Sequence, residues 1–377
     1  MNKLNYSLIN IFSFFYRLVL RRVFFIFDAE RVHEFVINLG EGLGNIGFSK
    51  FIERFFHIYD PSLKQKIAGI DFENPIGLAA GFDYNAKLTG FMSATGFGFE
   101  TVGTITNKPS EGNPKPRLSR LVESGSILVN KGFKNPGVLV VMQNVAGNKF
   151  NLPVGISIGQ TNSDLSLDEA VGDIVSSFEL LEKNGNPFHY YELNISCPNL
   201  SGSESFSDPD NLIKILNPIK GLKLKKPLFI KMPINKTNEE TLEMLKIISS
   251  FPVVGVIFGN LEKNRNNPAI KTEEAFRFKD RKGNLSGKPT QARSRELIKL
   301  AYKNFGERLV IIGCGGIFSA EDAYEKIRNG ASLLQLITGL IYKGPQLPYQ
   351  INMGLIYLLK KDGFLHISEA VGVDANT

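Results

Sequence analysis

The sequence contains few of the residues that disulfide frameworks and metal sites require. Its 377 residues include two cysteines, Cys197 and Cys314, and four scattered histidines. Two cysteines cannot form a disulfide framework, and a chain of this length can bury a core without one, so we expect a reducing compartment. No HExxH or CxxC motif occurs. We therefore expect no metal held by the protein.

The composition excludes several further classes of protein. With 43% apolar and 21% charged residues, the chain is not a disordered one, and 36 glycines and 18 prolines are too few for collagen or low-complexity sequence. Lysine and arginine outnumber aspartate and glutamate by 44 to 37, a net charge of +7 that permits an anionic partner. The basic residues form no stripe with interleaved aromatic residues, so we expect no nucleic acid partner.

The first 27 residues differ in character from the rest of the chain. No charge occurs from Leu4 to Tyr16, and the 27 residues together contain six phenylalanines. Arg17, Arg21 and Arg22 interrupt the apolar stretch near the lower limit of the roughly 20 residues that a bilayer span needs. This pattern favours a helix in the membrane interface, with the arginines at the lipid headgroups, over a single span, a signal peptide or a buried core helix.

A second short helix is expected directly after this segment. Asp28 can cap a helix over Ala29 to Leu39, in which apolar residues recur at helical spacing. The two helices would form a small membrane-associating module over residues 1–45, in front of a main domain over residues 46–377. We expect the protein at the cytoplasmic face of a membrane, as a peripheral protein rather than one with a single span.

From about residue 74, short β-rich runs alternate with longer helical patterns. The runs are continuous and apolar, which is typical of strands buried on both faces. This alternation predicts an α/β fold, a (β/α)8 barrel, with its chemistry at the carboxyl ends of the strands. The long segments Thr106–Leu152 and Asn260–Arg308 are expected to fold over that mouth. The eight predicted strands are Ile76–Ala80, Phe99–Ile105, Val154–Ile158, Tyr191–Ser196, Leu228–Met232, Val254–Phe258, Leu309–Gly313 and Leu333–Ile337.

Polar and glycine residues follow these predicted strands. Gly315-Gly316 and Thr338-Gly339 follow the seventh and eighth strands, where barrels commonly bind phosphate. Lys231, near the end of the fifth strand, would be costly to bury alone, so it implies either a Schiff base or an anionic ligand. Cys197 follows the fourth strand among hydrogen-bonding residues, where we expect an exposed thiol that transfers a proton. Cys314 is interpreted as a buried, inert cysteine.

Several motifs together resemble those of the dihydroorotate dehydrogenase family, over nearly the whole chain, and the family's barrel agrees with the one predicted above. The N-terminal helix pair, with FFIFDAERVHEF (24–35), resembles that of the membrane-associated, quinone-reducing class. The motifs are NPIGLAAGFD (74–83), GFGFETVGTIT (96–106), EGNPKPRLSRL (111–121), NISCPN (194–199), LSGKP (285–289), GCGGIFSAEDA (313–323) and ISEAVG (367–372).

The resemblance implies an FMN-dependent oxidation of dihydroorotate to orotate, in which C5 loses a proton and hydride passes from C6 to the flavin. Quinone would reach the flavin through a tunnel formed by the N-terminal module, and Cys197 would be the catalytic base. Lys231 would be a cation beside the reduced flavin ring. The implied FMN contacts are Ala80, Gly81, Thr104, Asn194, Lys231, Gly287, Gly315, Gly316 and Thr338, and the implied substrate contacts are Asn194, Asn199 and Asn260.

The chain departs from the family pattern at several positions. Cys197 stands where the quinone class carries serine, as in the soluble class, and a thiol of lowered pKa would be a competent base. Tyr84 replaces a substrate-binding lysine. Without that cation, the binding free energy of a carboxylate substrate would fall by about 2–5 kcal/mol unless another cation substitutes. In the substrate loop, Asn130 lies one position after the place where the family pattern has its asparagine. Lys131 is the candidate cation to take the place of the lysine lost at Tyr84. Ser157, Gly259 and Ile337 replace a typical asparagine, threonine and tyrosine near the flavin and quinone.

Three other functions remain open from the sequence. One keeps the flavin and the barrel but acts on another dihydropyrimidine or a cyclic amide. Another is a flavin-binding membrane protein without turnover. The third is an aldolase that uses Lys231 in a Schiff base, although it would leave Cys197 and the N-terminal module without a role.

Overall fold

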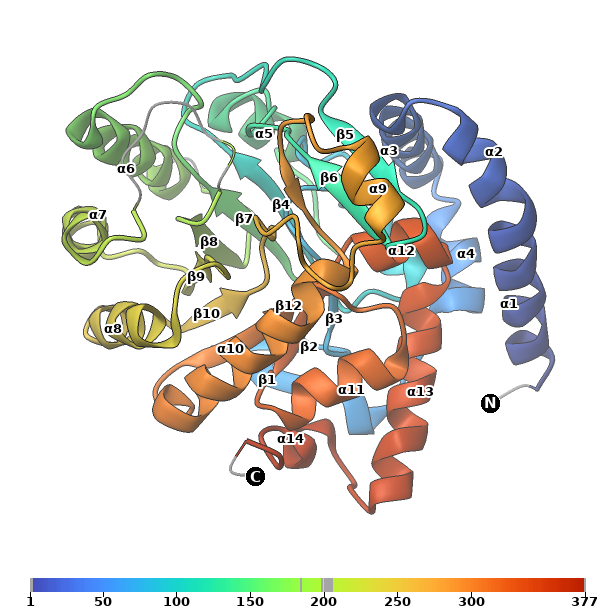
Figure 1. The fold of residues 1–377 in the computed structure, drawn as a ribbon. Coiled ribbons are helices and arrows are strands. Elements are labelled where there is room, and N and C mark those ends of the chain that lie inside the picture. Colours follow the sequence, from blue (N-terminus) through green and yellow to red (C-terminus); the bar gives the residue numbers. More distant parts are fainter. Residues whose placement is uncertain (1–2, 184, 198, 200–205, 376–377) are drawn as a thin grey trace.

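The centre of the molecule is a closed barrel of parallel strands (Figure 1). The computed structural model describes residues 3–183, 185–197, 199 and 206–375. Hydrogen bonds join the strands in the order β3-β4-β7-β8-β9-β10-β12-β13 and back to β3. The predicted (β/α)8 barrel is therefore confirmed. The barrel strands are β3 (Ile76–Leu78), β4 (Phe99–Ile105), β7 (Val154–Ile158), β8 (Tyr190–Asn194), β9 (Leu228–Met232), β10 (Gly255–Phe258), β12 (Val310–Cys314) and β13 (Leu333–Leu336).

The apolar runs form these strands because both of their faces are buried. Phe99, Tyr190 and Phe229 pack inside the barrel, whereas alternate residues such as Val102 and Leu193 face the surrounding helices. The predicted strands match the observed ones to within one or two residues at each end. Cys314 ends β12 rather than lying in the turn after it, and it is buried.

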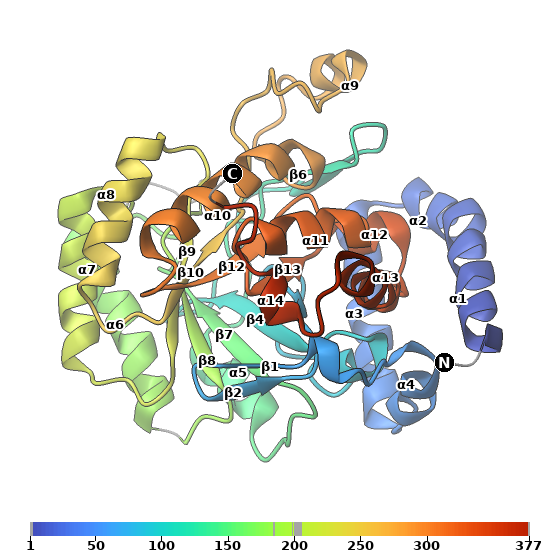
Figure 2. The same ribbon diagram turned by 90° about the horizontal axis from the view of Figure 1, so that it is seen from below.

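Helices surround the barrel. Their starts follow from the sequence: Thr237 and Glu240 form a capping box at α8, and the Ser319 hydroxyl caps α11. After the last barrel strand, α13 packs against α11 and beside β3. The helices that follow β6 along the chain, of which α9 stands away from the barrel (Figure 2), are α5 (Val138–Val145), α6 (Leu167–Lys183), α7 (Pro209–Gly221), α8 (Asn238–Ser249), α9 (Thr272–Arg277), α10 (Gln291–Phe305), α11 (Ala320–Arg328), α12 (Thr338–Lys343), α13 (Leu347–Asp362) and α14 (Ile367–Ala370).

The two long segments after β4 and β10 meet at the mouth of the barrel, as expected. They form a separate antiparallel sheet of β5 (Leu118–Leu121), β6 (Ser126–Val129) and β11 (Asn284–Leu285). Away from this sheet, the hairpin of β1 (Gln65–Ile67) and β2 (Ile70–Phe72) places Ile67 and Phe72 in the apolar cluster inside the barrel.

The N-terminal module contains α1 (Lys3–Phe15), a π-helical turn (Tyr16–Leu20), α2 (Arg21–Ile26) and α3 (Ala29–Asn45), and α4 (Ser49–Phe56) follows it. The Asp28 carboxylate caps α3, as predicted, by accepting hydrogen bonds from the backbone of Glu30 and Arg31. Figures 1 and 2 show α1 and α2 along one side of the molecule, near α12 and α13. The Tyr16 hydroxyl donates to the carbonyl oxygen of Ile341 at 2.9 Å and so joins the module to α12.

Large apolar side chains are exposed along this module. Among the residues that the structure describes, none of the helices combines the length and hydrophobicity that a membrane crossing requires. The most exposed of these side chains, each with more than half of its surface accessible, are Ile11, Phe14, Ile26, Phe27, Phe35 and Ile46.

Candidate active site

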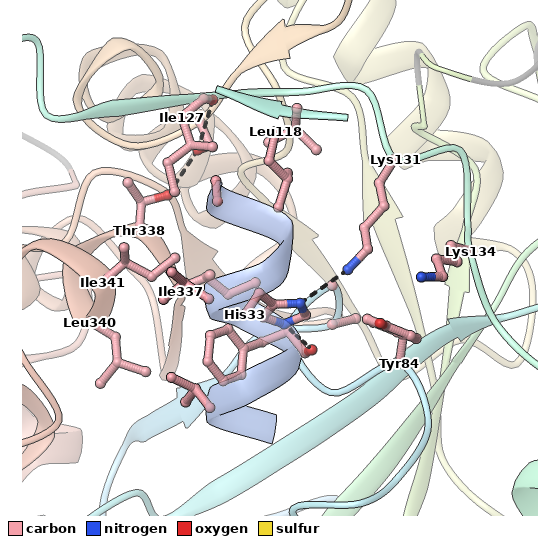
Figure 3. A pocket seen from close by; sticks show the side chains of 18 of the residues that line it. His33, Tyr84, Leu118, Ile127, Lys131, Lys134, Ile337, Thr338, Leu340 and Ile341 are labelled. Carbon is pink, nitrogen blue, oxygen red and sulfur yellow. Dashed lines mark hydrogen bonds between the residues drawn. The ribbon is translucent and has the colours of Figure 1, made fainter. Parts of the chain in front are cut away.

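A cavity of about 500 Å³ lies between the barrel mouth and the N-terminal helices. Its two ends differ in chemistry. One end is lined by apolar residues of α1 to α3 and α12, among them Phe24, Val36 and Leu340. Figure 3 shows several of the lining side chains around α3. The other end is lined by most of the predicted site residues, which are Ala80, Gly81, Thr104, Lys131, Asn194, Cys197, Asn199, Lys231, Asn260 and Thr338.

The ends of β4, β7 and β8 place a chain of polar side chains at the bottom of the cavity. The Asn194 amide donates to the Thr104 hydroxyl at 2.9 Å, and the hydroxyls of Thr104 and Ser157 are 3.0 Å apart. These residues meet because neighbouring parallel strands end at one edge of the barrel. Thr104 and Asn194 line the cavity and therefore offer hydrogen-bonding groups to a ligand at the mouth, whereas the fully buried Ser157 supports Thr104 from outside the cavity.

Loop residues extend this polar floor. The Asn260 amide donates to the Ser196 carbonyl oxygen at 3.0 Å and also contacts the Ser196 hydroxyl. The Asn199 amide donates to the Val129 carbonyl oxygen at 3.0 Å. Both asparagines are thus held in place at the cavity wall by hydrogen bonds to neighbouring residues.

Asn130 is not brought to the cavity. Its Oδ1 accepts a hydrogen bond from the Asn113 amide at 2.9 Å, and the same amide donates to the Asn199 carbonyl oxygen at 2.8 Å. Asn284 donates to the Asn199 side chain at 2.7 Å. Sequence patterns gave no indication of Asn113 or Asn284. Both lie on the long segments that were expected to fold over the barrel mouth, and the sequence did not show which residues of those segments would face each other.

Cys197 lies at the cavity wall, in a setting that differs from the expected one. The thiol is half-buried rather than exposed. Burial raises its pKa to about 11, against smaller lowering effects from the Asn199 backbone and the Lys231 charge. The expectation of a lowered thiol pKa was wrong, because removal of the thiolate from water outweighs its single nearby cation.

Lys231 is a buried cation on β9, with 5% of its surface exposed, and it lines the cavity. None of the ion pairs among the described residues involves it. Glu192 on the neighbouring strand is fully buried, and burial raises its pKa while the charge of Lys231 lowers it. A cation buried in this way is suited to an anionic group in the cavity.

The predicted phosphate residues gather beside the polar end. Gly315 and Gly316 have φ angles of 90° and 71°, and a side chain on either would collide with Thr290 or Gln291 at the start of α10. The Thr290 hydroxyl donates to the Gly287 carbonyl oxygen at 2.8 Å. The Ser286 and Thr338 hydroxyls are 2.8 Å apart. These loops leave bare backbone and hydroxyl groups together, as a phosphate site needs.

Lys131 packs between an aromatic ring and an imidazole (Figure 3). Its Nζ lies 3.8 Å from the centroid of the Tyr84 ring and donates to His33 Nδ1 at 3.4 Å. Burial lowers the pKa of Lys131 to about 7 and, with a contribution from the charge of Lys131, that of His33 to about 3. The sequence pattern indicated His33 only as part of the helix predicted over Ala29 to Leu39. Its place in the apolar face of α3, beside Val32 and Val36, is the signal that could have singled it out.

Comparisons with known proteins agree with this geometry. The family model described as dihydroorotate dehydrogenase matches residues 62–359. The chain is 35% identical to the dihydroorotate dehydrogenase (quinone) of Natronomonas pharaonis, over 94% of this chain and 98% of that one. It is 37% identical to the dihydroorotate dehydrogenase (quinone) of Christiangramia forsetii, over 90% and 98% of the two chains.

A solved structure is similar as well. The crystal structure of DHODH from Eimeria tenella in complex with ferulenol superposes with a TM-score of 0.80 at 29% identity, over 92% of this chain and 96% of that one. The matching family model, the curated relatives and the similar solved structure lead to one conclusion. The chain belongs to the dihydroorotate dehydrogenase family.

Proposed function

We propose that this protein oxidises dihydroorotate to orotate with FMN as its cofactor and passes the electrons to quinone, in pyrimidine synthesis. One observation carries the proposal: a single cavity joins the polar strand ends of the barrel to the apolar faces of the N-terminal helices. A polar heterocycle could enter one end and an apolar electron acceptor the other. The names of the curated relatives, dihydroorotate dehydrogenase (quinone), support the same reaction.

The residues around the polar end fit FMN. When bound, the flavin would accept hydride from C6 of the substrate and later pass the electrons on. Lys231 would balance the negative charge of the reduced ring, and Asn194 and Thr104 would hydrogen-bond its polar edge. Ala80 and Gly81 would give close approach to the ring. The ribityl phosphate would bind among Gly287, Gly315, Gly316 and Thr338.

Substrate would bind against the polar floor. Asn194, Asn199 and Asn260 supply the donors and acceptors that a planar pyrimidine edge needs. Cys197 would take the proton from C5 while hydride leaves C6, and Lys131 would bind the carboxylate in place of the lysine lost at Tyr84. Asn130 would contribute only by holding Asn113, which in turn donates to Asn199.

The apolar end would admit quinone from a membrane. Other apolar side chains of the same module, such as Ile11, Phe14 and Phe27, are exposed at its surface. These residues would lie among lipid acyl chains, with the exposed Arg17 and Arg22 at the headgroups. Arg21, which was expected there too, donates instead to the carbonyl oxygen of Tyr342 at 3.2 Å. We place the protein as a peripheral one at the cytoplasmic face.

An anaerobic bleaching assay tests the proposal. The purified protein should be yellow, lose its flavin absorbance with dihydroorotate and regain it with a short-chain quinone. Because Tyr84 replaces the usual lysine, other dihydropyrimidines and cyclic amides belong in the same assay. Bleaching by one of these alone would change the substrate, and a yellow protein that no substrate bleaches would indicate a flavin-binding protein without turnover. A colourless protein that cannot be loaded with FMN would contradict the proposal.

A further inference from the structure

The N-terminal helix α3 reaches the polar end of the cavity through one side chain, His33. Its Nε2 donates to the carbonyl oxygen of Phe82 at 2.8 Å, in the loop after β3. This bond fixes the proton on Nε2, so Nδ1 carries a lone pair. That lone pair faces the Nζ of Lys131 at 3.4 Å (Figure 3). Because burial holds the pKa of His33 at about 3, the ring stays neutral and remains an acceptor at any ordinary pH.

The charges around Lys131 leave it without an anion of its own. Glu30 contacts Arg117 at 2.9 Å and Lys134 at 3.5 Å, and Glu34 contacts Lys134 at 2.8 Å. Both carboxylates of α3 near this point are therefore engaged, and no ion pair of Lys131 occurs in the part of the chain that the structure describes. Its amine is held instead by a neutral imidazole and the face of the Tyr84 ring. An arrangement that positions an ammonium group while leaving it unneutralised suits a carboxylate ligand.

We propose that His33 is a positioning residue for substrate binding: it holds the Lys131 amine where the dihydroorotate carboxylate binds. The N-terminal module would then belong to the substrate site as well as to the quinone path. This inference rests on the proposed function and deepens it. A module that served quinone alone would be dispensable for reduction of the flavin by substrate. In this geometry, one side chain of the module, His33, takes part in substrate binding and so in flavin reduction.

Half-reactions of the holoenzyme separate these two roles. We would measure the dissociation constant of dihydroorotate by anaerobic stopped-flow reduction of the flavin, that of orotate by its perturbation of the flavin spectrum, and reoxidation by a short-chain quinone. H33F removes the acceptor and keeps a ring, and H33Q restores an acceptor. R31A, an exposed position on the same helix, is the matched control.

H33F should weaken binding of both dihydroorotate and orotate by about tenfold, the size expected for losing one hydrogen bond to a charged group, with the limiting reduction rate changed by less than about threefold. H33Q should recover most of the affinity, and R31A should match the unmodified protein. Unchanged affinities in H33F together with slowed quinone reoxidation would overturn the inference and leave His33 to the quinone path.

A double-mutant cycle distinguishes positioning from a general disturbance of the fold. If His33 acts through Lys131, H33F should add less than about twofold to the loss of orotate affinity in a K131M background. Full additivity of the two losses would overturn the inference. Unmodified holoenzyme that contains flavin but is neither bleached by dihydroorotate nor perturbed by orotate would contradict the proposed function itself, and this inference with it.

Discussion

Glu30 on helix α3 and Arg117 before strand β5 form a buried ion pair, with 2.9 Å between Oε1 and Nη1 and less than a tenth of either side chain exposed. Arg117 also donates to the backbone carbonyl oxygens of Asn113 and Glu111. The pair joins the N-terminal module to the segment that covers the barrel mouth. It therefore helps to hold together the two surfaces between which the cavity lies.

Substitution of Glu30 by alanine should lower the free energy of unfolding by about 3–5 kcal/mol, because it leaves a buried guanidinium without its partner. Denaturant unfolding of the flavin-loaded protein would measure the loss. The exposed pair Lys64–Glu73, at 2.9 Å, offers the matched control, and Lys64→Ala should cost no more than about 1 kcal/mol. Equal effects of the two substitutions would show that burial does not decide the strength of the Glu30 pair.

Dihydroorotate affinity should depend on pH through Lys131. The pKa of this lysine is lowered to about 7, and it binds a carboxylate only as the cation, which predominates below that pKa. The dissociation constant should therefore be constant at low pH and rise as the pH increases above about 7. His33 and Tyr84, which contact the amine, stay neutral over this range, because the pKa of His33 is lowered to about 3 and that of Tyr84 is raised. The nearby Glu34 and Lys134 keep their charges, since their hydrogen bond lowers the pKa of Glu34 and raises that of Lys134.

The variant Lys131→Met checks the source of that pH dependence. It should weaken dihydroorotate binding by about 2–5 kcal/mol at pH 6 and remove the change in affinity above pH 7. Titration of substrate against flavin absorbance at several pH values gives both results. A pH dependence that persists in the variant would assign it to another group.

Cys197→Ala should slow reduction of the flavin by substrate by about 10²- to 10⁴-fold, the usual loss for a general base, and leave the spectrum of the bound flavin unchanged. Because burial raises the thiol pKa to about 11, the reduction rate of the unmodified protein at saturating substrate should climb with pH up to that value. Stopped-flow measurements at saturating dihydroorotate would show the climb. An unchanged rate in the alanine variant would remove Cys197 as the base.

Gly316→Ala should reduce the FMN content of the purified protein. The new methyl group would collide with Gln291 at the start of α10 and force the loop after β12 to move. Gly147→Ala is the matched control, since Gly147 has a similar φ of 75° but open space around it. The control should cost about 1–2 kcal/mol of stability from the left-handed backbone and keep full flavin content. Equal flavin loss in both would argue against a phosphate site at Gly316.

The sequence allowed the barrel and most of the site to be predicted because both depend on local patterns. Each strand is a buried apolar run, and the residues that follow it, such as Thr104 and Asn194, reach the mouth in any barrel of this order. Local patterns could not predict the raised pKa of Cys197. It depends on how much water the surrounding loops exclude from the thiol, and those loops come from distant parts of the chain.

The amino-acid sequence alone determined that this protein is a barrel with its chemistry at one rim and an apolar helical module at its N-terminus, since strand burial, helix caps and motif positions are encoded over a few residues each. The meeting of His33, Tyr84 and Lys131, and the bond that holds Asn130 to Asn113 outside the cavity lining, follow instead from how distant segments pack. The contacts among His33, Tyr84 and Lys131 join residues about 50 to 100 positions apart, and they depend on how α3 packs against the loops of the barrel mouth.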